Sequence, residues 1–304
     1  MAGHRSRTRP LTELYQPYTP DEDRVRTNQH YALPAEFFTL VTGGEWHTYS
    51  GNLWDGASTA TQSQEKKLDR LAELLRLRSG QRVLDVGCGW GGPLVYLSRT
   101  YGVTGVGLTL SPAQKAWAEA RALHHRVNVR FVERHWQDYR DAEQFDAVYC
   151  DEASVHFQDL FSYFKKMWEL LRANGLILNK DLHFAHPRYS KMSRTLAFVN
   201  EIFGETGNYR TLSEELRHLA DAGFDLRQLE QIPMSEYWRT IDGWLENVRL
   251  HRRRMEELVG ATYYRRYRKF LEIGRRYLLN PNMISLDVVL AQKSGEAEFA
   301  AEAV

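Results

Sequence analysis

The sequence has few cysteines, no long apolar run and almost no net charge, and each absence excludes a class of protein. Two cysteines, Cys88 and Cys150, cannot form a disulfide framework, and no metal-ligand spacing surrounds them. The net charge of +1 lacks the basic excess of a general nucleic-acid binder. No apolar run reaches the ~20 residues that span a bilayer, and no apolar stretch follows the basic start as in a secretory signal. We therefore expect a reduced cytoplasmic protein with no stable membrane insertion and no nucleic-acid partner.

Apolar runs that alternate with amphipathic helices are what the sequence does contain. Leucines recur with helical spacing across residues 61–77, and short apolar runs bounded by turn residues predict buried strands. These strands are expected within residues 81–92, 103–111, 127–133, 144–153, 174–182, 224–232 and 284–293. The alternation predicts an α/β fold, with a parallel sheet covered by helices on both faces.

Capping residues predict where two of the helices begin. Ser111 can cap a helix, and Gln114 stands at the position of its capping-box partner. Thr211 and Glu214 form the same motif before a helix that Gly223 ends.

Several stretches fall outside the alternation. Residues 1–25 lack periodicity and are expected to be loose, and Pro34 interrupts a short segment at 26–38. Residues 184–211 and 235–280 follow or separate strands, and the second stretch is helical, aromatic and rich in arginine. Insertions at strand ends usually build a lid or a substrate pocket.

The run VLDVGCGWGG is the strongest motif in the chain. Gly87 and Gly89 allow a tight turn after a strand, and Asp85 at the strand end can bind a charged or hydroxyl group. The helix that follows offers free backbone N–H groups. The spacing is neither the dinucleotide fingerprint nor a P-loop. A tight turn without a ligand is the structural alternative.

The glycine turn, with GLTLSPAQ after it, resembles the S-adenosylmethionine-dependent methyltransferases of the cyclopropane fatty-acid synthase type. NQHYALPAEFF, TYSGNLW, WQDYRD, FDAVY and YWRTIDGWLENVR also match that family's pattern, over roughly residues 28–293. The resemblance implies a Rossmann-like class I methyltransferase sheet, mostly parallel with its last strand antiparallel. It divides the chain into a lid segment at 1–60, a methyltransferase domain at 61–293 that carries the two insertions, and a flexible tail at 294–304.

The resemblance also implies how S-adenosylmethionine would be held. Tyr49 and Ser50 would close over its methionine end, and the backbone of Gly87 and Gly89 would pass beneath it with the support of Asp85. Thr109 and Gln114 would reach the ribose, and Trp136 with Gln137 would hold the adenine. The structural alternatives are that Gln114 only caps its helix and that Trp136 only fills the core.

One part of the family pattern is missing. Cyclopropane synthases of this family hold a bicarbonate base, and the places of three of its ligands are Gly51, Val155 and Lys180 in this sequence. Only Tyr237 matches the pattern. An anion without its donors is costly to bury, so we expect no bound bicarbonate and no ring formation.

Glu152 is our candidate base. It stands at the carboxyl end of the fourth strand, where open α/β sheets bind ligands. Methyl transfer to an alkene leaves a carbocation, which needs apolar aromatic walls and a base that removes a neighbouring proton. His156 would orient Glu152 or the substrate, and Tyr237 with Trp238 would line the pocket. The structural alternatives are an exposed helix-capping carboxylate at 152 and a core histidine at 156.

The predicted protein is therefore a C-methyltransferase for a hydrophobic small molecule, either an isoprenoid or an unsaturated lipid. The alternatives are an N-methyltransferase for a hydrophobic amine, a cyclopropane synthase and a non-catalytic binding module. The arginines of 235–280 are interpreted as mostly a solvated face. The sequence leaves open whether the protein forms a homo-oligomer.

Overall fold

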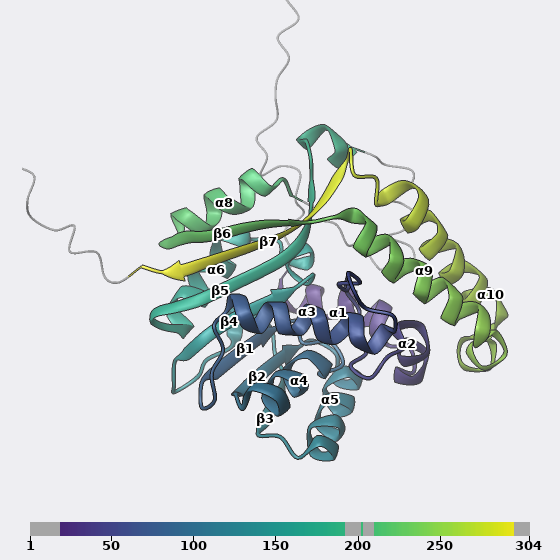
Figure 1. Ribbon diagram of the computed structural model, residues 1–304, viewed down its shortest axis with the longest axis horizontal. Helices are drawn as coiled ribbons and strands as arrows, with labels where there is room; N and C mark the ends of the chain where they lie inside the picture. Colours follow the sequence, from purple (N-terminus) through teal and green to yellow (C-terminus); the bar gives the residue numbers. More distant parts are fainter. Residues whose placement is uncertain (1–18, 192–201, 203–209, 295–304) are drawn as a thin grey trace, which may run out of the picture.

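A seven-stranded sheet forms the centre of the molecule (Figure 1). The computed structural model describes residues 19–191, 202 and 210–294. The strands are β1 (Arg82–Val86), β2 (Thr104–Thr109), β3 (Val129–Glu133), β4 (Phe145–Asp151), β5 (Leu171–Phe184), β6 (Phe224–Ile232) and β7 (Ile284–Lys293). Their order is β3-β2-β1-β4-β5-β7-β6, and only β7 runs antiparallel to its neighbours. The predicted class I sheet, with its antiparallel last strand, is confirmed.

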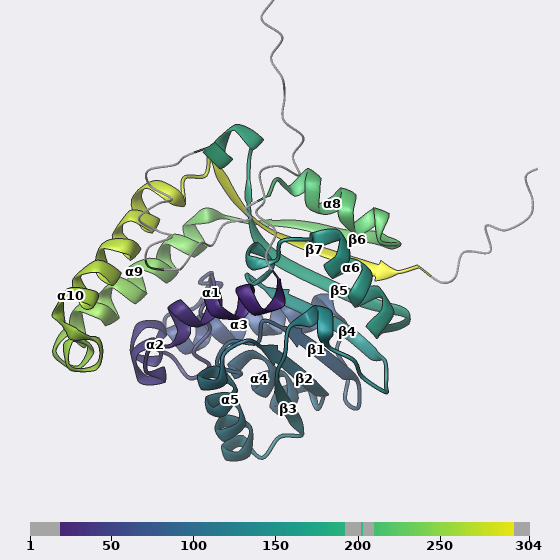
Figure 2. The same ribbon diagram turned by 180° about the vertical axis from the view of Figure 1, so that it is seen from behind.

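Helices cover both faces of this sheet (Figures 1 and 2). They are α1 (Pro20–Tyr31), α2 (Ala35–Thr42), α3 (Ala60–Leu74), α4 (Gly92–Tyr101), α5 (Pro112–His125), α6 (Leu160–Leu170), α8 (Leu212–Asp221), α9 (Met234–Leu250) and α10 (Arg252–Ile273). Short turns of helix are η2 (Trp136–Asp138), η3 (Ser154–His156), η4 (Pro187–Lys191) and η5 (Gly274–Leu278). None of the described helices is long and apolar enough to cross a membrane.

The strands have apolar residues on both faces because each face has its own core. Along β1, Val83 belongs to the core beneath α3 and α4, whereas Leu84 and Val86 belong to the core beneath α6 and α8. All three side chains are at most 2% exposed. The continuous apolar run that predicted a buried strand therefore reflects burial on both sides.

Capping side chains set most helix starts, and they correct two predictions. Thr19 and Glu22 form a capping box that starts α1, so residues 20–25 are helical rather than loose. The Thr211–Glu214 box is confirmed. Ser111 caps α5 as predicted, but the side chain of Gln114 accepts a hydrogen bond from Thr109 and does not complete a box.

The stretch at 235–280 is helical, as predicted. It forms α9 and α10, which pack against each other and against α2 beyond the sheet (Figure 1). Gly260 interrupts α10 with a non-helical backbone at φ 80°. Most of the stretch at 184–211, the first 18 residues of the proposed lid and nearly all of the proposed tail lie outside the described residues.

A buried histidine joins the antiparallel edge of the sheet to α8. His183 of β5 lies between Asp287 of β7, at 3.0 Å, and Glu215 of α8, at 2.7 Å. Burial disfavours its charge, but the carboxylates of Glu215 and Asp287 prevail and raise the pKa of His183 to about 10. The folded protein thus keeps a proton that an unfolded histidine releases near pH ~6.5.

This proton makes stability depend on pH. The stabilisation by His183 is complete below pH ~6.5 and is lost as the pH rises towards about 10, because over that range only the folded state holds the proton. We expect the free energy of unfolding, measured by urea titration, to fall over this range in the wild type and to fall less in His183→Gln. The control His124→Gln removes an exposed histidine and should keep the wild-type slope. Equal slopes in all three proteins would contradict the assignment.

Candidate active site

A cavity opens at the carboxyl ends of β1, β2 and β4. Strand β1 pairs with β2 on one side and with β4 on the other, so the cavity lies at the switch point of the sheet, where α/β proteins bind ligands. Its lining includes Asp23, Thr27, Tyr31, Tyr49, Ser50, Asp85, Gly87, Gly89, Trp90, Thr109, Gln114, His135, Trp136, Asp151, Glu152 and His156. The loop before α3 and helix α1 thus complete a site that the sheet begins.

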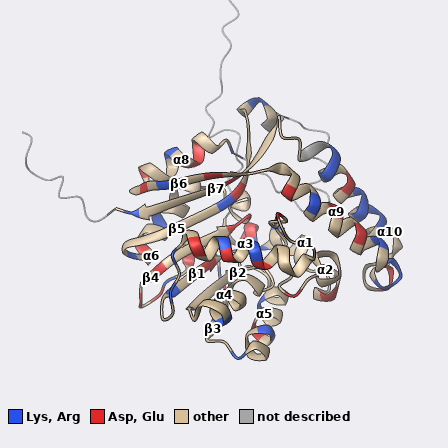
Figure 3. Ribbon diagram, viewed as in Figure 1, with Lys and Arg blue, Asp and Glu red and all other residues tan. Residues whose placement is uncertain are grey.

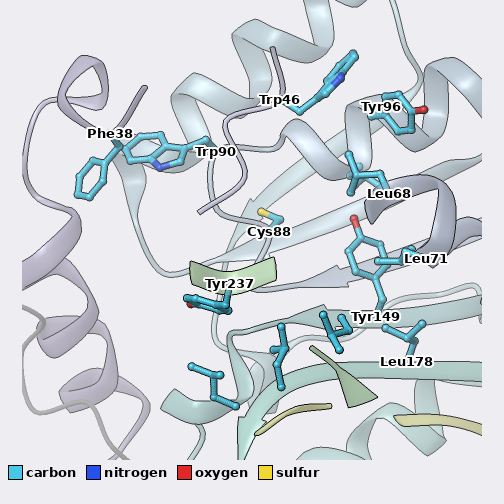
Figure 4. Close-up of a cluster of buried hydrophobic side chains, with 14 of the residues drawn as sticks. Phe38, Trp46, Leu68, Leu71, Cys88, Trp90, Tyr96, Tyr149, Leu178 and Tyr237 are labelled. Atoms are coloured by element: carbon cyan, nitrogen blue, oxygen red, sulfur yellow. The ribbon is translucent and has the colours of Figure 1, made fainter. Parts of the chain in front are cut away.

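The glycine turn forms the floor of the cavity. Gly87 has φ 85°, and a Cβ there would lie 2.3 Å from the Cβ of Ala153, so only glycine fits. A Cβ at Gly89 would meet nothing within 4 Å, which leaves open space above its backbone. Between the glycines and α4, the ring of Trp90 packs against Phe38 of α2, with ring centroids 5.2 Å apart (Figure 4).

Eight of the nine residues predicted to hold the cofactor line this one cavity: Tyr49, Ser50, Asp85, Gly87, Gly89, Thr109, Gln114 and Trp136. The ninth, Gln137, is exposed and lies outside the lining, and its backbone N–H donates to His135. His135 lines the cavity beside Asp23, at 3.2 Å. The sequence motifs did not point to this pair, because Asp23 lies in the segment interpreted as loose.

Asp85 lies at the end of β1 and is buried. Tyr149 donates a hydrogen bond of 2.6 Å to its carboxylate. Burial, which outweighs this bond, raises the pKa of Asp85 to about 8. The carboxyl group is therefore poised to ionise when a cationic group binds beside it.

Glu152, the candidate base, follows β4 and is held by three donors. The backbone N–H of Gly51 donates to Oε1 at 2.8 Å, Tyr237 donates to Oε2 at 2.7 Å, and Lys180 forms an ion pair with Oε1. The side chain is 7% exposed. It does not cap the following helix α6, whose N-cap is Asp159. The helix-capping alternative is therefore wrong.

The backbone of Glu152 is left-handed, with φ 60°. A residue with a side chain rarely adopts this conformation, and such outliers gather at functional sites. The conformation turns the carboxylate towards Gly51 and Tyr237.

Glu152 belongs to a buried cluster of two lysines and two carboxylates, whose other members are Lys67, Lys180 and Asp151. Lys180 bonds Asp151 at 2.8 Å, and Lys67 bonds the other oxygen of Asp151 at 2.8 Å. The hydroxyl of Ser50 accepts a hydrogen bond from Lys67 and donates one to Asp151. Burial works against the charges, but the two lysines hold the pKa of Asp151 well below its usual range, and Asp151 and Glu152 raise that of Lys180. The cluster therefore balances its own charge.

The donors expected to be missing are present in another form. At two of the three places where the family's bicarbonate ligands are missing, Gly51 supplies a backbone N–H and Lys180 supplies an ammonium group. With Tyr237 they converge on Glu152 itself. At the third place the backbone N–H of Val155 bonds Asp181, away from Glu152. The expectation that no donors surround this spot is therefore wrong.

His156 lines the cavity but does not orient Glu152. In the described part of the chain its ring makes no hydrogen bond to Glu152, and the charge of Asp23 acts on it. Burial lowers the pKa of His156, so the ring is neutral at neutral pH. His30 on α1, close by, is also neutral because burial lowers its pKa to about 3.

The aromatic residues of α9 and α10, Tyr237 and Trp238 included, are not among the residues that line the cavity. Two of them support Tyr49. Trp244 stacks on Tyr49 at 5.0 Å, and the hydroxyl of Tyr267 bonds that of Tyr49 at 2.6 Å. Trp238 instead donates to the carbonyl of Leu279. Figure 3 shows basic residues along the outer side of α10. Six arginines of residues 235–280 pair with acidic residues as a solvated face would: Arg249, Arg252, Arg253, Arg254, Arg268 and Arg275.

Comparison with known proteins identifies the family. The model of the mycolic acid cyclopropane synthetase family matches residues 19–286. The chain belongs to this family. It is 27% identical to a probable fatty acid methyltransferase of Pseudomonas putida over 89% of this chain and 70% of the relative. It is 28% identical to methoxy mycolic acid synthase MmaA3 of Mycobacterium tuberculosis, over 80% and 86% of the two chains.

A solved structure of the family carries the cofactor product. The crystal structure of mycolic acid cyclopropane synthase CmaA1, complexed with SAH and CTAB, matches with a TM-score of 0.82 and 25% identity over 89% of this chain and 98% of that chain. The present protein is, like its relatives, an S-adenosylmethionine-dependent methyltransferase. The cavity of this chain fits that cofactor: there is open space above the backbone of Gly89, and the buried Nε1 of Trp136 has no hydrogen-bond partner among the described residues.

Asp85 should make cofactor binding by the methyltransferase depend on pH. Free Asp85 is mostly protonated below about pH 8, and only its ionised form attracts the ammonium group of a methionine moiety. We expect the affinity for S-adenosylhomocysteine to rise by up to about tenfold per pH unit from pH 6 towards 8. Calorimetry at several pH values measures this rise. Asp85→Asn should bind more weakly and lose the pH dependence; a variant that keeps the wild-type profile would contradict the role.

Proposed function

We propose that this methyltransferase adds a methyl group to an alkene carbon of a hydrophobic substrate and that Glu152 then removes a proton. The observation that carries the proposal is the buried Glu152 carboxylate, already ion-paired, at the edge of the cofactor cavity. The names of the relatives, a probable fatty acid methyltransferase and a methoxy mycolic acid synthase, support a lipid-like substrate. An isoprenoid substrate fits the same chemistry.

The proposed reaction has two steps. The bound cofactor would supply an electrophilic methyl group. The π electrons of the alkene form the new carbon–carbon bond as the bond between the methyl carbon and sulfur breaks, and its electron pair leaves with S-adenosylhomocysteine. This leaves a positive charge on the neighbouring carbon. A C–H bond next to that carbon then breaks, its electrons form the new double bond, and Glu152 takes the proton. Oε2 is the better acceptor, because among the described residues it accepts only the Tyr237 hydroxyl, whereas Oε1 already accepts Gly51 and Lys180.

A base in this position needs correct placement more than strong basicity. A C–H bond beside a carbocation is strongly acidic, so even a carboxylate that accepts several hydrogen bonds can take its proton. The residues around it also tolerate a cation. His30 and His156 are uncharged, and the aromatic residue Tyr49 lines the cavity.

The charge balance of the cluster favours a neutral substrate. Lys180 already neutralises Glu152, and Lys67 and Lys180 both bond Asp151. An ammonium substrate would bring another cation next to these buried lysines, which is costly. An alkene binds without charge and becomes positive only in the transition state, where stabilisation increases the rate.

Incubation with methyl-labelled S-adenosylmethionine tests the proposal. The panel should contain unsaturated fatty acyl lipids, prenyl diphosphates and hydrophobic amines, with the saturated lipids as matched controls. We expect label in a carbon-bound methyl group of an unsaturated substrate, and none in the saturated lipid. A labelled amine, with a rate that follows titration of that amine, or a cyclopropane ring in the product would contradict it.

A further inference from the structure

One face of α9 packs along the loop that leads into α3. Residues 43–59 form neither helix nor strand, and they bring Tyr49 and Ser50 to the cavity. Trp244 of α9 stacks on Tyr49, with ring centroids 5.0 Å apart. Thr240 lies one turn earlier on the same helix and therefore on the same face, where it bonds the loop a few residues further along. The loop thus takes its support from α9.

The hydroxyl of Thr240 uses its whole hydrogen-bonding capacity. It accepts the backbone N–H of Asn52 at 3.0 Å and the indole N–H of Trp54 at 2.9 Å, and it donates to the carbonyl of Glu236 at 3.0 Å. A hydroxyl group offers one donor and two acceptor positions, and all three are occupied here. Thr240 is 1% exposed, so in the folded protein water does not substitute for these bonds.

Asn52 connects this anchor to the residues that line the cavity. Its side-chain carbonyl accepts the hydroxyl of Thr48 at 2.7 Å, and both residues are at most 2% exposed. Tyr49 and Ser50 lie between them in the chain, and Thr48, Tyr49 and Ser50 all line the cavity. The position of these lining residues therefore depends on Asn52 and, through it, on Thr240.

We propose that Thr240 is a positioning residue for the cofactor, because its hydroxyl holds the loop at 48–54 against α9 and so keeps Tyr49 and Ser50 over the bound S-adenosylmethionine. Thr240 itself does not line the cavity and acts only through the loop. Without the hydroxyl, two N–H groups lose their buried acceptor, and the loop regains partners for them by opening to water. Cofactor binding must then close the loop again, which raises the apparent dissociation constant by the inverse of the closed fraction.

Binding of S-adenosylhomocysteine to Thr240→Val tests this role. Valine keeps the shape of threonine and lacks only the hydroxyl. We expect the dissociation constant from calorimetry to rise by about tenfold or more, and that of Thr240→Ser, which retains the hydroxyl, to stay within about twofold of wild type. The control Thr39→Val removes a hydroxyl that, among the described residues, bonds only the carbonyl of Glu36 in its own helix α2. It should bind as the wild type does.

Hydrogen exchange separates positioning from a general loss of stability. In Thr240→Val the backbone amides of residues 50–54 should exchange faster than in the wild type, and S-adenosylhomocysteine should restore part of their protection. The amides of β1 should keep the wild-type rate. A variant that is only less stable would exchange faster in β1 as well and, while folded, would bind the ligand with wild-type affinity.

Two results would overturn the proposal. One is a folded Thr240→Val that binds S-adenosylhomocysteine as tightly as the wild type, and the other is a Thr240→Ser that binds as weakly as Thr240→Val. Thr240→Ala is measured in the same way if the valine variant does not fold. No methyl acceptor is needed, so the outcome is independent of the reaction proposed at Glu152.

Discussion

Replacement of Glu152 by glutamine is expected to lower turnover by about 10²–10⁴-fold, the usual contribution of a general base. Glutamine keeps the shape of the side chain. Its amide oxygen can still accept the hydrogen bond from Gly51 and its amide nitrogen can donate to the hydroxyl of Tyr237, but it cannot take a proton. The affinity for S-adenosylhomocysteine should stay within about twofold of wild type, because only the proton acceptor is altered. Single-turnover rates and calorimetry on the same preparations measure both effects.

A matched control is Glu133→Gln. Glu133 ends the edge strand β3 and does not line the cavity, so its glutamine variant should turn over at the wild-type rate. Nearly unchanged turnover in Glu152→Gln would show that Glu152 is not the base. Parallel loss of cofactor binding would show that Glu152 acts in binding rather than in proton removal.

Replacement of Lys180 by methionine is expected to cost about 3–5 kcal/mol of unfolding free energy, the range for breaking a buried ion pair by removing one partner. The carboxylates of Asp151 and Glu152 would then share the cavity edge with Lys67 alone. Urea titration at neutral pH measures the loss.

The double variant Lys180→Met/Glu152→Gln should recover a large part of that stability, because it removes the carboxylate that Lys67 does not bond, whereas Asp151 keeps its ion pair with Lys67. Lys66→Met is the surface control. Lys66 pairs with Asp55, and their side chains are 43% and 94% exposed, so its loss should cost at most about 1 kcal/mol. A Lys180→Met variant as stable as Lys66→Met would contradict the buried charge cluster.

The sheet could be predicted from the sequence because its strands are short apolar runs between turn residues. β6 and β7 match the predicted ranges, since sheet and turn signals coincide there. Helix α1 was missed because its apolar periodicity is weak. Its start was nevertheless encoded, since Thr19 and Glu22 have the spacing of a capping box.

The site was predictable only where a local motif marked it. The glycine turn, Glu152 and Tyr237 stood out in their motifs, whereas Lys67 did not, because its partner Asp151 is 84 residues away. One signal was available. Lys67 lies on the same face of α3 as the buried Gln64, Leu68 and Leu71, and a charge on a buried face requires a partner. Which residue pairs with it depends on tertiary packing.

The most direct test of the account uses S-adenosylmethionine with a fully deuterated methyl group. If an alkene carbon is methylated and Glu152 removes a proton from a neighbouring carbon, mass spectrometry and NMR should find all three deuterium atoms on one new carbon-bound methyl group, with one substrate hydrogen lost. A product that retains only two of the three deuterium atoms would mean that the proton came from the transferred methyl group itself, as in ring closure, and would contradict the account.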